Sequence, residues 1–287
     1  MSISENIAAF RKTGNPFFLI KALLLTLKQN RIKELLFGIY CNIFSSPAIL
    51  HAGTIELIKN ILSSSGPLLS SKFAYSRNEL IGCFGDYYEI GQLPHDFSLA
   101  RKESIVIDPD FLIIGECVDS NKRIAYITSD SCTINNTYAT DKQIGHIHAI
   151  HKIKSSSVIL VTTGDAAKYL DQWELKDGRL TFIKRLKKSL SGYTAIVCVN
   201  GDTFWGTDFS SRPNYIERSD GKRFFFPQKA YRMYVVAFHE CFNRYILSIN
   251  KDIHQLGNKW ALSIFDTITE KFIYCEYYND PQQFIDN

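Results

Sequence analysis

The sequence lacks the short motifs that identify several common protein classes. None of its seven cysteines form a C-x-x-C pair, which excludes zinc ribbons and thioredoxin-like redox sites. It contains no phosphate-binding glycine loop and no G-x-S-x-G turn, which argues against P-loop enzymes and against hydrolases with a nucleophile elbow. We find no secretory signal with a clean cleavage site, so we expect a cytoplasmic protein with reduced thiols.

Methionine is scarce and a strong excess of charge is absent. The chain has 2 Met but 20 Phe, 15 Tyr and 3 Trp, and this composition favours β-strands over a helical bundle. The formal net charge is only +4 over 287 residues. A balance this mild predicts no nucleic-acid partner.

Charge and aromatic residues divide the chain into two parts. Residues 1–72 carry eight Lys and Arg against three Asp and Glu, whereas residues 73–287 are nearly neutral and rich in aromatics. The stretch from Ser63 to Pro67 is typical of a linker. We therefore expect a helical N-terminal extension over 1–72 and a separate domain over 73–287.

The extension has three interpretations. Its helices can cap the main domain, or they can lie on an anionic membrane surface through their basic side chains. The third is a membrane-spanning helix within Leu35–Ile55, which contains no charged residue. Ser45, Ser46 and Pro47 interrupt that stretch and favour two short helices instead.

A repeat runs through the second part of the chain. An apolar strand followed by a small or polar residue and then aspartate recurs five times, with 44, 35, 43 and 44 residues between successive aspartates. The five aspartates are Asp86, Asp130, Asp165, Asp208 and Asp252. Units of about 40 residues are typical of propeller blades. The repeat predicts an all-β fold, a five-bladed β-propeller, with a two-sheet sandwich as the alternative.

Turn residues inside the units support this interpretation. The third unit predicts strands over 145–153, 158–163, 169–175 and 180–186, and Asp177-Gly178 joins the last two. The fourth unit has Asn200-Gly201 at its first turn. Such dipeptides between alternating strands are strong hairpin signals. In a propeller of this kind, the five aspartates are expected on one face, as a carboxylate ring or as simple turn caps.

The segment Gly145–His151 carries the first candidate site residues. On a strand, His146 and His148 share one face. With the hairpin turn centred between Ser155 and Ser156, His146 pairs with Asp165 and His148 with Thr163. A carboxylate beside histidine suits acid–base chemistry. No third ligand is specified, so we predict no metal and no cofactor.

The remaining candidate site residues lie in the fourth unit. Aromatic faces beside polar groups suit sugar rings. We interpret Asp165 or Asp208 as a catalytic base and His146 as the group that orients or shuttles the proton. His148, Trp205, Arg212 and Tyr193 are the expected substrate contacts, and core packing is the alternative for Trp205.

Three motifs carry a resemblance to a known group of proteins. They are Gly145-His146-Ile147-His148, Val161-Thr162-Thr163-Gly164-Asp165 and Trp205-Gly206-Thr207-Asp208. They resemble motifs of bacterial β-propeller proteins associated with surface-polysaccharide and lipopolysaccharide biosynthesis loci. The resemblance covers about residues 75–280 and implies a pathway rather than a reaction.

Three functions remain open from the sequence. The first is carbohydrate binding or processing in cell-envelope polysaccharide assembly, with a glycan or glycolipid as partner and peripheral attachment to the inner membrane. The second is a glycoside hydrolase with two rim carboxylates. The third is a non-catalytic protein-interaction scaffold.

Overall fold

The structure is a computed structural model of the chain. It describes residues 74–117, 122–141, 143–164, 168–188, 192–209, 213–227, 230–231, 233–252 and 259–278, together with Ile20 and Asn60. The expected helical extension over 1–72 therefore lies almost wholly outside the described residues. The candidate residues Asp165 and Arg212 also lie outside them.

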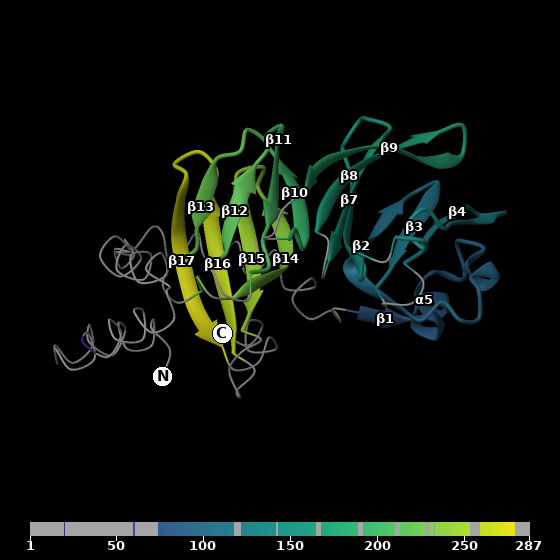
Figure 1. Ribbon diagram of the computed structural model, residues 1–287, viewed down its shortest axis with the longest axis horizontal. Helices are drawn as coiled ribbons and strands as arrows, with labels where there is room; N and C mark the ends of the chain where they lie inside the picture. The colour runs from purple at the N-terminus through teal and green to yellow at the C-terminus, as the bar shows by residue number, and fades with distance from the viewer. Residues whose placement is uncertain are drawn as a thin grey trace.

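Within the described residues, seventeen strands form four antiparallel sheets that follow one another along the chain (Figure 1). The first sheet contains β1 (Ala74–Ser76), β2 (Leu99–Asp108), β3 (Phe111–Glu116), β4 (Ile124–Ile127) and β5 (Cys132–Asn135). The second contains β6 (His146–Lys152), β7 (Val158–Gly164), β8 (Tyr169–Lys176) and β9 (Arg179–Lys188). The third contains β10 (Ala195–Val199), β11 (Asp202–Gly206), β12 (Tyr215–Arg218) and β13 (Arg223–Phe225). The fourth contains β14 (Tyr234–Cys241), β15 (Tyr245–Lys251), β16 (Trp260–Asp266) and β17 (Lys271–Tyr278).

These sheets are the blades of an all-β propeller with four blades. Strands β2, β6, β10 and β14 are the inner strands: β6 packs against β2 and β10, and β10 packs against β14. The Arg101 guanidinium on β2 reaches the Val236 carbonyl on β14, which links the first blade to the last. Within the described residues, no helix is long and apolar enough to cross a membrane.

The prediction of five blades is wrong, because the first two sequence units belong to one blade. The apolar segment before Asp86 is not a strand but the helix α5 (Arg77–Phe84), followed by the 3-10 turn η1 (Ile90–Gln92). A capping box starts α5: the Ser76 hydroxyl accepts from the Glu79 N–H, and the Glu79 carboxylate accepts from the Ser76 N–H. This reciprocal cap stabilises the first helical turn.

The expected ring of five aspartates on one face is also wrong. Asp86 follows α5, and Asp130 lies in the turn between β4 and β5, which correspond to the third and fourth strands of the other blades because β1 adds a strand before β2. Turns after third strands and turns after second strands lie on opposite faces of a propeller. Asp208 and Asp252 follow the second strands β11 and β15 as predicted. In the first blade the corresponding acidic residue is Glu116, fully buried at the end of β3.

The strands and hairpins of the second and third blades confirm the sequence prediction. Each of the four strands predicted over 145–186 matches β6, β7, β8 or β9 within two residues. Asp177 and Gly178 adopt φ of 50° and 70°, and Asn200 and Gly201 adopt 50° and 85°. Positive φ at both central residues defines the tight turn that matches the twist of a hairpin.

Two glycines allow neighbouring blades to approach closely. A Cβ on Gly115 of β3 would lie 2.7 Å from a side-chain carbon of Ile147, which belongs to the next blade. A Cβ on Gly206 of β11 would lie 2.6 Å from the Cβ of Val235, again in the next blade. Any larger residue at these positions would separate the sheets, so the blade contacts require glycine there.

Candidate functional site at the propeller axis

The predicted histidine site lies where β6 begins, but a β-bulge changes its register. Lys152 pairs with Ile159 and Ala149 with Thr162, which confirms the turn centred between Ser155 and Ser156. A bulge between Ile147 and Ala149 then shifts the pairing, so that His146 faces Gly164. The predicted pairs of His146 with Asp165 and of His148 with Thr163 are therefore wrong.

The bulge places His148 in a tight, buried position. Its side chain is almost completely inaccessible, and its ring fills the space beside Gly164, where a Cβ would lie 2.1 Å from Nε2. Nδ1 lies 3.1 Å from the Tyr193 carbonyl, which makes Nδ1 the protonated nitrogen and leaves Nε2 as an acceptor. The His146 ring lies 4.4 Å from the His148 ring, centroid to centroid.

Asp208 lies close to this imidazole. Its Oδ2 is 4.0 Å from His148 Nε2, and its other carboxylate oxygen forms an ion pair with Lys168. The structure therefore brings His146 and His148 together at the start of β6, with Asp208 beside His148. Lys168, which sequence reasoning missed, is the cation of this group; it precedes β8 and its ammonium also donates to the Asp208 carbonyl.

The expected aromatic sugar contacts are buried in this structure. Trp205 is 3% exposed and Tyr193 is 2% exposed, and their rings meet edge to face with centroids 5.7 Å apart. The Lys187 ammonium covers the Trp205 ring. These rings pack in the apolar core between the second and third blades. Their role as substrate contacts stays a prediction, as do the roles of Asp165 and Arg212.

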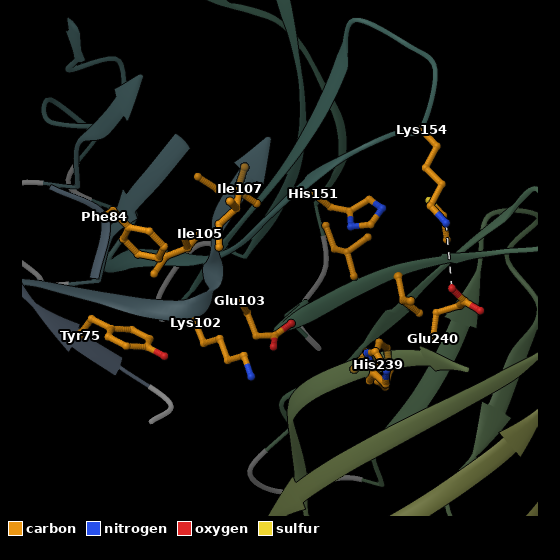
Figure 2. A pocket seen from close by; sticks show the side chains of 15 residues that line it. Tyr75, Phe84, Lys102, Glu103, Ile105, Ile107, His151, Lys154, His239 and Glu240 are labelled. Atoms are coloured by element: carbon orange, nitrogen blue, oxygen red, sulfur yellow. Dashed lines mark ion pairs between the residues drawn. The ribbon is translucent and has the colours of Figure 1, made fainter. Parts of the chain in front are cut away.

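A cavity of about 400 Å³ lies further along the axis, toward the ends of the inner strands (Figure 2). All four inner strands contribute side chains to it, so it belongs to the whole propeller rather than to one blade. Its walls include Ile105, Ile150 and Phe238, and its polar groups are Lys102, Glu103, His151, Lys154, His239 and Glu240. A mostly apolar hollow with a few converging polar groups is typical of a small-molecule site.

Glu103 is a strongly perturbed acidic group in the cavity. Burial raises its pKa from 4.5 to about 7, against the opposing effects of Arg101, Lys102 and a hydrogen bond from the Phe238 N–H. Figure 2 shows this side chain projecting from β2 toward β14. A carboxyl group with this pKa can donate or accept a proton near neutral pH.

Burial also holds three other cavity groups, His151, His239 and Lys102, toward their neutral forms. Burial, with a smaller effect from Lys154, lowers the pKa of His151 to about 4. Burial lowers the pKa of His239, with Glu240 opposing it, and burial lowers the pKa of Lys102, with Glu103 opposing it. His151 Nε2 is buried and has no hydrogen-bond partner. The cavity thus offers donors and acceptors that a polar ligand would satisfy.

Few features of the sequence indicated this cavity. His151 stood in the histidine-rich segment, but Glu103, His239 and Glu240 belong to no repeated motif. Their positions become meaningful only when β2 and β14 are recognised as inner strands of neighbouring blades. Among the described residues, no three His, Cys, Asp or Glu side chains are grouped so that they could hold a metal ion.

Comparisons with known proteins do not assign this chain to a family. No family model matches the chain, and no curated protein matches it. The functional argument therefore depends on the geometry of the axis.

Proposed function

We propose that this propeller binds or processes a carbohydrate of the cell envelope and that the sugar occupies the axial cavity. The observation that carries the proposal is Glu103, a carboxyl group with a pKa of about 7 inside a cavity lined by two neutral histidines. The resemblance of the three sequence motifs to propellers of polysaccharide and lipopolysaccharide loci supports the choice of ligand class and pathway.

The lining of the cavity suits the two sides of a sugar ring. Phe84, Phe238 and the isoleucines offer apolar surface for the C–H face of the ring. Glu103, His151 and His239 offer both donors and acceptors for its hydroxyl groups. A cavity of about 400 Å³ falls within the range of small-molecule sites and suits a short segment of a glycan.

The first prediction is direct binding of a glycan. On an array of bacterial surface glycans, the purified full-length chain should bind a restricted set that shares a terminal sugar. Titration calorimetry with the free oligosaccharide should give one site per chain. An array with no bound glycan would contradict the proposal and would favour the protein-interaction scaffold.

A glycoside hydrolase is a second candidate, and the pKa of Glu103 favours it. Such enzymes use one protonated carboxyl group as the general acid and a second, ionised carboxylate as base or nucleophile. Glu103 fits the acid, and Glu240 is the second acidic residue that lines the cavity. A hydrolase would release reducing ends from a bound glycan, whereas a binding protein would leave it intact.

We also propose that residues 1–72 attach the protein to the cytoplasmic face of the inner membrane. This segment has a net charge of +5 and apolar stretches. Each basic residue near an anionic surface contributes about 1 kcal/mol, and salt screens the attraction. The chain should float with anionic liposomes at low salt and less so at high salt. Equal flotation with neutral liposomes would contradict this attachment.

A further inference from the structure

We propose an oxyanion-binding subsite at the beginning of the inner strands, in which Arg101 binds a carboxylate or phosphate group of the ligand. The subsite deepens the proposed function, because it predicts that the envelope sugar is acidic or phosphorylated. The subsite also stands on its own observations, which concern Arg101 and neighbouring groups that do not line the cavity.

The first observation is the state of Arg101. Its guanidinium is half-buried, and the hydrogen bond that the structure gives it is a long one, 3.3 Å from Nη2 to the Val236 carbonyl. In the described part of the chain, no carboxylate lies within ion-pair distance of this guanidinium. A planar, permanently charged group in this position is suited to a carboxylate or phosphate, which it can bind through two parallel hydrogen bonds.

The second observation is the positive surroundings of His148. Burial lowers the pKa of this imidazole well below its ordinary value, and the positive charges of Arg101, His146 and Lys168 lower it further. Asp208 lies 4.0 Å from Nε2, but its charge is compensated by the Lys168 ammonium. Lys168 and Asp208 thus compensate each other, whereas no ion pair among the described residues compensates Arg101.

The third observation is that several elements bring these groups together. Tyr234 of β14 interacts electrostatically with Arg101 and with Asp208; burial raises its pKa, so its hydroxyl stays a neutral donor. The charged and titratable groups that face this point are Arg101 and Glu103 of β2, His146 and His148 of β6, Lys168 before β8, Asp208 after β11 and Tyr234 of β14. Lys168 compensates Asp208, and burial holds Glu103 toward its protonated form, so the charge of Arg101 is left for an anionic ligand to neutralise.

The test measures binding of inorganic phosphate, D-glucuronate and D-glucose by titration calorimetry. It uses the wild-type chain and the variants Arg101→Gln, Arg101→Lys and Arg218→Gln. Arg218 is the matched control, because it is paired with Asp220 and Glu270 at the outer side of the third blade. We expect Arg101→Gln to weaken phosphate or glucuronate binding at least tenfold, Arg101→Lys to weaken it less, and Arg218→Gln to leave it unchanged.

The outcomes separate this subsite from the sugar proposal. Phosphate binding that depends on Arg101, without binding of any sugar, supports the subsite and removes the carbohydrate function. Tighter binding of glucuronate than of phosphate identifies an acidic sugar, and the reverse order identifies a sugar phosphate. Glucose binding equal to glucuronate binding, or anion binding unchanged in Arg101→Gln, overturns the subsite.

A second variant keeps the test decisive if Arg101→Gln does not fold. Lys168→Gln leaves Arg101 in place but removes the charge that compensates Asp208, so anion affinity should again fall several-fold. The imidazole NMR signals of His148 provide a local readout, because an anion at Arg101 should raise the pKa of that ring. Unchanged signals at saturating phosphate would overturn the subsite.

Discussion

Replacing Trp173 with alanine is expected to lower the free energy of unfolding by about 3–5 kcal/mol, the usual cost of removing a buried tryptophan. Trp173 of β8 is completely buried, and its indole N–H donates to the Tyr138 hydroxyl over 2.9 Å. That hydroxyl donates in turn to Asp171, which is paired with Arg185. The substitution opens a cavity and weakens this buried network. Urea unfolding followed by circular dichroism measures the loss, which is large beside a typical total of about 5–15 kcal/mol.

Phenylalanine substitutions at Trp173 and Trp205 give a matched control. Both indoles are buried and both changes remove the same atoms, but the Trp205 N–H has no hydrogen-bond partner. Losing a satisfied donor weakens a network, whereas losing a buried unsatisfied donor removes a penalty of about 1–3 kcal/mol. Trp173→Phe should therefore cost more than Trp205→Phe by about 2 kcal/mol. Equal losses would show that the network around Tyr138 contributes little.

Replacing Glu103 with glutamine is expected to stabilise the protein at pH 8 and to leave its stability nearly unchanged at pH 4. The pKa of Glu103 is about 7 in the folded chain, against an ordinary value of 4.5. Between these two values the folded state binds more protons than the unfolded state, so wild-type stability falls as the pH rises through this window. At about 1.4 kcal/mol for each pH unit between the two pKa values, the loss by pH 8 is at most about 3 kcal/mol. Glutamine cannot ionise and avoids that loss.

The measurement is thermal unfolding of both proteins from pH 4 to pH 8. The difference in unfolding free energy should grow with pH and favour the variant. Arg101 and Lys102 on β2, His151 on β6 and His239 and Glu240 on β14 all remain in both proteins, so their titration is common to both curves. A variant that is equally stable or less stable at pH 8 would show that the cavity does not hold Glu103 in its protonated form.

The same variant distinguishes the two carbohydrate functions. Glutamine keeps the shape and hydrogen-bonding capacity of the protonated acid, so a glycan should still bind. It cannot transfer a proton, and loss of a general acid typically lowers the rate by about 10²–10⁴-fold. Reducing-end release by the wild type that falls by this factor in Glu103→Gln would identify a hydrolase. Binding without release in both proteins would identify a carbohydrate-binding propeller.

Local patterns were sufficient to predict the four strands of the second blade and the hairpin turns of the second and third blades. Alternating side chains and the Asp177-Gly178 and Asn200-Gly201 turns depend on residues near each other in the sequence, so they were found without a structure. The predicted number of blades was wrong because it also depended on a local pattern. Leu80 to Asp86 has the apolar content of a strand, but the Ser76–Glu79 cap favours a helix.

The site was harder to predict than the fold. The bulge beside His148 moved the histidine pairing by one residue, because the ring requires the space that Gly164 leaves open. The cavity depends on side chains from four inner strands that are about 45 residues apart in the sequence. No local pattern joins Glu103 to His239, and only the closure of the propeller brings them to one cavity.

The most direct test of the carbohydrate proposal is glycan binding with the axial cavity blocked. Ile107 lines the cavity and is 62% exposed, so Ile107→Trp should fill its mouth without disturbing the core. Ile268 is 64% exposed and lies in the turn between β16 and β17, so Ile268→Trp is the matched control. Titration calorimetry with a glycan selected on the array should show binding to the wild type and to Ile268→Trp, and at least a tenfold loss for Ile107→Trp. Equal binding by all three proteins would contradict a sugar site in this cavity.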